Sequence, residues 1–259
     1  MNTIISNAQK SFTLAVAPIV AVIIGSLTFP NSGFGQINAQ ATRPYVLILP
    51  GVLGKQFWDE NLLHGIQNSV FQGEAEIYDW TNGPLAIAQN IGGSDIESDF
   101  LTQRIVDFKT QFPNRPLFLI GHSGGCRMAL NCVENLPYGS SLVERIILLS
   151  PCMESRYDLC RTINRTSKGI VAYRSPLDIP ISVPLTTVHG LAKGKLSASA
   201  AVIGFQIPNH LDFQQRAFYT SKLAQRTYHP KMLNTGHIGG HFGWTLPSFA
   251  ATYIVNDLR

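Results

Sequence analysis

Gly121-His122-Ser123-Gly124-Gly125 spells the pattern G-x-S-x-G, and it lies between an apolar run, Pro116 to Ile120, and the stretch Cys126 to Val133. The apolar run is typical of a buried strand, and the stretch after the pattern is typical of a helix. A sharp turn from strand to helix exposes the serine at its apex. It also requires glycines beside that serine, because larger side chains would collide with the neighbouring strand or helix. The pattern therefore predicts a reactive serine, Ser123, at such a turn.

Length and composition favour one compact domain. The chain has 259 residues, of which 45% are hydrophobic and 14% are charged. That size is enough for a sizeable core, and the low charge argues against disorder. The net charge of +4 includes no basic block, so a nucleic-acid partner is not predicted.

Predicted strands and helices alternate along the chain. Such alternation predicts an α/β fold, a doubly wound and mostly parallel sheet with helices on both faces. Ligands in such sheets bind beyond the carboxyl ends of the strands. The expected strands are residues 45–49, 75–80, 116–120, 143–149, 169–173 and 232–234, and the expected helices are residues 62–71, 94–112, 126–136 and 246–258.

The N-terminal segment differs in kind from the rest. Lys10 precedes an uncharged apolar stretch, residues 12–29, and Ala39-Gln40-Ala41 supplies a small-residue cleavage pattern before Thr42. These features predict a signal peptide, residues 1–41, ahead of a single folded domain, residues 42–259, and hence an exported protein, periplasmic or secreted. The stretch is also near the lower length limit of a membrane span, so an uncleaved anchor remains an alternative, and only that alternative predicts membrane contact.

The four cysteines give no metal-binding spacing. Cys126 and Cys132 fall on different sides of one predicted helix and should not pair. Cys152 and Cys160 flank a short segment and could form a disulfide in an exported protein, or remain buried free thiols. Because no C-x-x-C spacing occurs, no metal site is predicted.

Four motifs in a fixed order resemble the α/β-hydrolase superfamily over residues 44–258. They are Leu49 to Gly54 (LPGVLG), Gly121 to Gly125 (GHSGG), Tyr173 to Asp178 (YRSPLD) and Gly239 to Gly243 (GGHFG). The chain is similar in particular to a small lipase/esterase-like branch, in which a GHSGG elbow is followed by an S-x-x-D loop and a GGHFG loop. The resemblance implies the α/β-hydrolase fold with a minimal cap.

The resemblance also implies a catalytic triad. A serine hydroxyl needs a base, and the base needs an orienting carboxylate. By the resemblance Ser123 is the nucleophile, Asp178 the acid and His241 the base. The rival acids are Asp158 and Asp212, whose positions also fit helix starts, and the rival histidine is His237, which otherwise suits a supporting or substrate-side position.

Two backbone N–H groups are expected to bind the oxyanion. One belongs to Gly124, directly after the nucleophile, and the other to Val52 in the loop after the first strand. Pro50 stands where many esterases have the histidine of an HGGG motif. The second donor therefore stays open between Val52 and Leu53.

These expectations combine into a serine hydrolase that cleaves carboxylic esters through an acyl-enzyme, with a small ester or acyl substrate and no cofactor. A peptidase, an amidase or an acyltransferase could use the same triad, and a non-catalytic binding protein on a decayed fold is the alternative of another class. The segment Leu185 to Gly204 is either a short cap or plain surface. It is too short for a full helical lid, which favours short acyl chains.

Overall fold

The structure is a computed structural model that describes residues 42–83, 85, 90, 95–192 and 198–259. The predicted signal peptide or anchor, residues 1–41, and Ser94, the first residue of the helix predicted over residues 94–112, lie outside the described residues. Among the helices that are described, none has the length and apolar character needed to cross a membrane.

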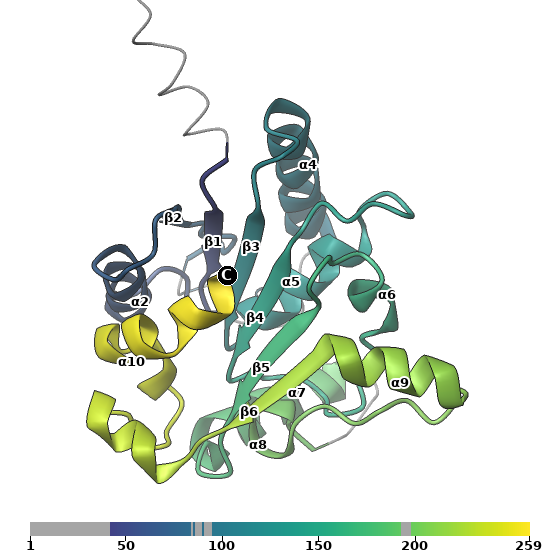
Figure 1. The fold of residues 1–259 in the computed structure, drawn as a ribbon. Coiled ribbons are helices and arrows are strands. Elements are labelled where there is room, and N and C mark those ends of the chain that lie inside the picture. Colours follow the sequence, from purple (N-terminus) through teal and green to yellow (C-terminus); the bar gives the residue numbers. More distant parts are fainter. Residues whose placement is uncertain (1–41, 84, 86–89, 91–94, 193–197) are drawn as a thin grey trace, which may run out of the picture.

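A parallel sheet forms the centre of the molecule (Figure 1). The described part of this sheet has six strands in the order β2-β1-β3-β4-β5-β6, and every neighbouring pair is parallel. The strands are β1 (Tyr45–Leu49), β2 (Glu74–Ile77), β3 (Leu117–His122), β4 (Arg145–Leu149), β5 (Ile170–Arg174) and β6 (Leu223–Thr227). The predicted α/β class with a mostly parallel sheet is confirmed.

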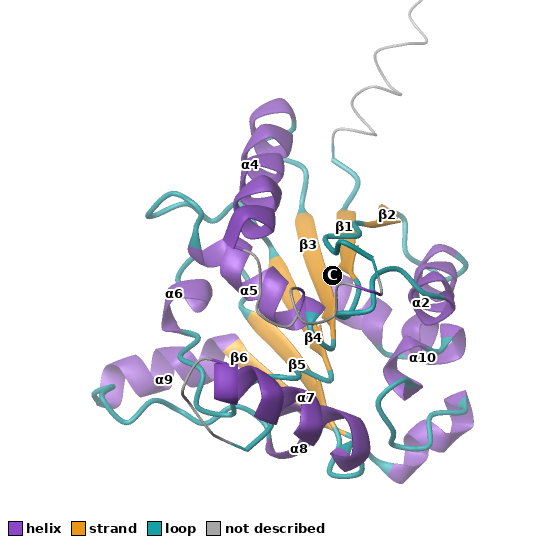
Figure 2. Cartoon of the chain, turned by 180° about the vertical axis from the view of Figure 1, so that it is seen from behind, coloured by secondary structure: helices purple, strands orange, loops and turns teal. Residues whose placement is uncertain are grey.

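Helices and 3-10 turns join the strands and cover the sheet on both faces (Figure 2). The helices are α2 (Phe57–Gln67), α4 (Asp95–Gln111), α5 (Gly125–Glu134), α6 (Cys160–Ile163), α7 (Ile179–Ala192), α8 (Ala200–Ile203), α9 (Phe213–Lys222) and α10 (Pro247–Thr252). The 3-10 turns are η2 (Pro230–Thr235), η3 (Gly243–Thr245) and η4 (Ile254–Leu258).

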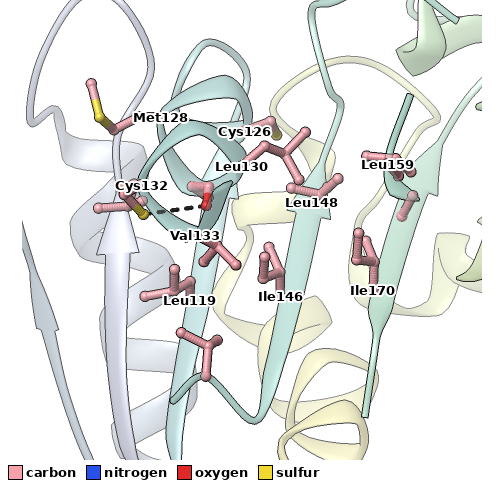
Figure 3. Close-up of a cluster of buried hydrophobic side chains, with 14 of the residues drawn as sticks. Leu119, Cys126, Met128, Leu130, Cys132, Val133, Ile146, Leu148, Leu159 and Ile170 are labelled. Carbon is pink, nitrogen blue, oxygen red and sulfur yellow. Dashed lines mark hydrogen bonds between the residues drawn. The ribbon is translucent and has the colours of Figure 1, made fainter. Parts of the chain in front are cut away.

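Alternate residues of the inner strands β1, β3, β4 and β5 build two separate cores, because successive strand side chains point to opposite faces. Leu47, Leu119 and Leu148 pack under α4 and α5, and Figure 3 shows part of this cluster, with α5 residues lying against β3 and β4. Ile48 and Ile120 point the other way and pack with α2, α10 and the C-terminal turns. The sheet is therefore buried on both faces, as parallel sheets are.

The prediction for the last strand was wrong. Residues 232–234 lie in the 3-10 turn η2, which begins at Pro230, and the sixth strand is β6. Four of the five β6 residues are exposed and the sequence there is polar, so the strand lacks the apolar run that marks the inner ones.

Two helix predictions need correction at their ends. The first helix spans Phe57–Gln67 rather than residues 62–71, because Gln56 and Asp59 form a capping box that starts it earlier. The closing helix is shorter than predicted and divides into α10 and η4.

Candidate active site

Ser123 lies at a strained turn between β3 and α5. Its φ of 55° is in the left-handed region, which only a few non-glycine residues adopt. Its N–H donates to the carbonyl oxygen of Leu149 in β4 at 2.9 Å, which fixes the turn to the sheet. A Cβ on Gly125 would lie 2.1 Å from the carbonyl oxygen of Leu49, so the close approach of helix and strand requires glycine there.

A buried histidine and carboxylate form the second part of the site. His241, in the loop between η2 and η3, lies with its Nδ1 2.8 Å from Oδ2 of Asp178. Asp178 follows β5 directly before α7. Both side chains are almost fully buried, so water does not weaken their interaction.

Two serines and a tryptophan support this pair. The hydroxyl of Ser150 donates to Oδ2 of Asp178, and the indole N–H of Trp244 donates to Ser150 Oγ at 3.0 Å. Ser182 in α7 places its Oγ 3.2 Å from Nδ1 of His241. The motif comparison missed Ser150 and Ser182. Ser150 could have been found from its place directly after a strand, but Ser182 gave no signal.

The hydroxyl of Ser123 contacts Cys152 rather than His241 in this structure. It donates to Sγ of Cys152 at 3.4 Å, and Cys152 in turn contacts Oγ of Ser182 at 3.5 Å. No hydrogen bond joins Ser123 to His241 within this described region. The two residues nevertheless line the same cavity.

That cavity has a volume of about 160 Å³ and a largely apolar wall. Helix α7 contributes Ile181 and Leu185, so the start of the segment predicted as a possible cap does cover the site. The remaining lining residues are Gly51, Val52, Leu53, Gly54, Trp58, His122 and Phe242.

The loop after β1 brings the backbone of Val52 against Gly124. A Cβ built on Gly124 would have its three nearest neighbours in Val52, including the backbone nitrogen at 3.4 Å. Two side chains fix the loop through hydrogen bonds to its backbone. Nδ2 of Asn90 donates to the carbonyl oxygen of Val52, and the indole N–H of Trp80 donates to the carbonyl oxygen of Pro50, each at 2.8 Å. Among the described residues, the N–H groups of Val52 and Gly124 have no hydrogen-bond acceptor, so both are available to a ligand.

Known proteins resemble this chain in structure rather than in sequence, since no protein-family model and no curated protein matches it. Lipase B of Aspergillus fumigatus matches with a TM-score of 0.52 at 14% identity, over 88% of this chain and 55% of the lipase. A cutinase-like protein from Cryptococcus sp. matches with a TM-score of 0.44 at 14% identity, over 84% and 96%. A hydrolase of the α/β superfamily from Xanthomonas campestris matches with a TM-score of 0.41 at 13% identity, over 80% and 96%.

Three findings point to the same fold: the structural likeness to lipase B, the all-parallel sheet, and the strained serine turn after β3. The chain has the α/β-hydrolase fold. The fold that the four motifs implied is thereby confirmed, while the roles of the individual residues remain a proposal.

His237 occupies a different place in this α/β-hydrolase fold from His241. Its ring is fully buried against Trp244 and Phe249, at centroid distances of 4.1 and 5.2 Å, and its Nδ1 accepts the N–H of Gly239 at 2.9 Å. Burial lowers the pKa of His237 to about 4, so the ring is neutral near pH 7. It does not line the cavity, which argues against the substrate-side alternative.

His122 and Asp59 form a buried pair behind the nucleophile turn. Nδ1 of His122 lies 3.8 Å from Oδ1 of Asp59, and neither atom has a hydrogen-bond partner among the described residues. Burial lowers the pKa of His122 to about 3, with nearby His241 acting in the same direction. Burial also raises the pKa of Asp59 to about 7. Sequence reasoning missed Asp59, which lies in α2 outside all four motifs.

The rival acids lie elsewhere in the α/β-hydrolase fold. Oδ1 of Asp158 accepts the N–H of Cys160, and Asp212 caps α9. Neither contacts His241 in the described structure. All four cysteines are free, so the possible Cys152–Cys160 disulfide does not form, and Cys152 lies beside Ser123 instead.

Proposed function

We propose that this protein is a serine hydrolase that cleaves carboxylic esters through an acyl-enzyme. One observation carries the proposal: Ser123, at its strained turn, shares a small apolar cavity with His241, which is bound to the buried carboxylate of Asp178. These are the three groups that nucleophilic catalysis by serine requires. A solved structure that shares the fold with a TM-score of 0.52 is named a lipase, which agrees with an ester substrate.

The proposed reaction begins with a rotation of the Ser123 side chain from Cys152 toward His241. Nε2 of His241 takes the hydroxyl proton while Oγ attacks the carbonyl carbon of the ester. Asp178 accepts the Nδ1–H of His241, which fixes the tautomer and stabilises the imidazolium. The imidazolium then gives its proton to the leaving alcohol, and water releases the acid by the same steps in reverse.

The N–H groups of Gly124 and Val52 are proposed to bind the oxyanion. Gly124 stands at the N-terminus of α5, where the helix dipole adds partial positive charge. Each donor in such a site is worth about 10²–10³ in rate. Leu53 is the alternative second donor, but its backbone is not among the nearest atoms to Gly124.

The cavity favours a short acyl group. Its volume of about 160 Å³ is close to that of a cavity that holds one benzene molecule, roughly 150 Å³. An acyl chain of about six carbons fills such a space, and a longer one must extend past Ile181 and Leu185 into solvent. Amide substrates and acyl transfer use the same groups, and the test below separates ester cleavage from amide cleavage.

A panel of p-nitrophenyl acetate, butyrate, octanoate and palmitate, beside peptide p-nitroanilides, tests this proposal. We expect the highest kcat/KM with acetate or butyrate and little turnover of the anilides. Ser123→Ala should abolish ester turnover above the level that the oxyanion site alone supplies, and its unfolding curve shows whether the fold is kept. Preferred cleavage of anilides would make the protein an amidase, and no turnover of either class would favour a binding protein.

We also propose that the protein is exported. The support is the uncharged stretch of residues 12–29 behind Lys10, followed by the cleavage pattern before Thr42. Membrane anchoring by an uncleaved segment is the outcome that the test in the Discussion separates from it.

A further inference from the structure

Three side chains with metal-binding atoms meet on the surface outside the active-site cavity. Asp158, Cys160 and His210 each offer one ligand atom, and these atoms lie within 4.8 Å of one another. Asp158 and Cys160 lie at the start of α6, and His210 precedes α9. The two helices pack side by side (Figure 1).

The separation of two of these atoms suits a shared cation better than a hydrogen bond. Nε2 of His210 lies 3.6 Å from Oδ2 of Asp158, which is beyond hydrogen-bond length. Two ligands of one tetrahedral zinc ion, with bonds of roughly 2.0–2.3 Å, lie roughly 3.3–3.8 Å apart. The sulfur of the partly exposed Cys160 lies within 4.8 Å of the ligand atoms of both other residues.

The carboxylate of Asp158 is already oriented for this role. Its Oδ1 accepts the backbone N–H of Cys160 at 2.9 Å, which leaves Oδ2 turned toward His210. Hydrogen bonds to the second oxygen of a ligating carboxylate are a regular feature of metal sites.

A buried hydroxyl beside the cluster lacks an acceptor. Tyr219 of α9 is only 2% exposed, and its hydroxyl donates a hydrogen bond to no described residue. It borders a cavity of about 520 Å³ together with Cys160 and His210. An unpartnered buried donor is costly unless a ligand or water accepts from it.

We propose that Asp158, Cys160 and His210 bind a zinc ion, with a water molecule as the fourth ligand that accepts a hydrogen bond from Tyr219. One thiolate, one imidazole and one carboxylate form a donor set that suits this borderline-soft cation. Binding replaces the thiol proton of Cys160 with a sulfur–zinc bond and releases that proton to solvent, with no change of oxidation state. The ion joins the chain after β4 to the loop before α9 and thereby stabilises the fold.

This site departs from the sequence prediction of no metal. That prediction used the spacing of cysteines alone, whereas the ligands come from two loops that meet only in the folded chain. The site does not touch the cavity of Ser123, so it stands or falls independently of the proposed hydrolase activity.

The reactivity of Cys160 provides the test. Cys126, Cys132 and Cys152 are buried in the folded protein, and Cys160 is the partly exposed cysteine. Ellman's reagent should therefore modify Cys160 first in metal-free protein. Equimolar zinc chloride should slow that reaction by at least about tenfold, because a zinc-bound thiolate is blocked from attack.

Variants and a second metal make the test specific. The zinc effect should disappear in His210→Ala and in Asp158→Asn, and it should persist in the control His64→Ala, which changes an exposed histidine of α2. Cobalt(II) should give a thiolate-to-metal charge-transfer band in wild-type protein that Cys160→Ser lacks, and circular dichroism should show that every variant folds. An unchanged rate with zinc in the wild type, or equal protection in His210→Ala, would overturn the proposal.

Discussion

The burial of His237 predicts a pH-dependent loss of stability that one substitution should remove. A folded-state pKa of about 4, against 6.5 for the free side chain, means that the unfolded chain binds a proton more readily between these values. Stability should therefore fall as the pH drops from about 6.5 to about 4. A tenfold change in proton affinity corresponds to about 1.4 kcal/mol, so the full contribution of His237 is about 3 kcal/mol.

His237→Asn isolates this contribution. The asparagine Oδ1 can still accept the N–H of Gly239, but the side chain no longer titrates. Lost packing against Trp244 should cost about 1–3 kcal/mol at pH 7, where the ring is neutral. The decrease in unfolding free energy between about pH 7 and 4 should then be smaller in the variant, by about 3 kcal/mol.

Urea unfolding at several pH values measures the difference directly. His122, whose pKa burial lowers to about 3, acts in the same direction in both proteins, and Asp59, whose pKa burial raises to about 7, acts in the opposite one. Only the difference between the two proteins therefore reports on His237, and His64→Asn is the matched control. Parallel stability curves for wild type and His237→Asn would refute the placement of His237 as a buried neutral ring.

Three further outcomes follow from the site and the fold. His241→Ala should reduce kcat by several orders of magnitude, and Asp178→Asn should reduce it by about 10⁴, the cost known for the same change in a serine protease, whereas His237→Asn should stay within about tenfold of wild type in steady-state assays. Gly125→Ala should lower the urea-unfolding free energy by about 1–3 kcal/mol, because its Cβ would meet the carbonyl oxygen of Leu49, and an unchanged value would contradict the steric reasoning. N-terminal sequencing of protein from the native host should start near Thr42, and a membrane-bound product that begins at Met1 would instead support an anchor.

The inner strands were predictable because each is an apolar run, as expected for a strand whose side chains are buried on both faces of the sheet. The edge strand β6 was not, since one side of an edge strand faces water and Gln225 and Arg226 interrupt any apolar run. The stretch at Met232 led to a wrong strand prediction for the converse reason. Its apolar residues pack as a 3-10 turn that Pro230 begins.

The contact between Asp178 and His241 also follows from a rule visible in sequence, since chain segments after parallel strands meet at one edge of the sheet. The supporting groups follow from no such rule. The contacts of Ser150 with Asp178 and of Ser182 with His241 depend on side-chain rotamers, which the sequence does not show. Serine is also too common for its position alone to identify these two residues. The sequence indicated Cys152 only as a possible disulfide partner or a buried free thiol. Its position beside Ser123 is visible only in the three-dimensional structure.

Mass spectrometry of protein treated with a fluorophosphonate probe tests the central proposal most directly. Such a probe phosphonylates a serine that a histidine activates, with loss of fluoride, and the peptide that carries Ser123 should gain the mass of the probe less HF. We expect that adduct in wild-type protein and its near-complete loss in His241→Ala. An unlabelled wild-type protein, or a label that forms equally fast without His241, would contradict the proposed triad.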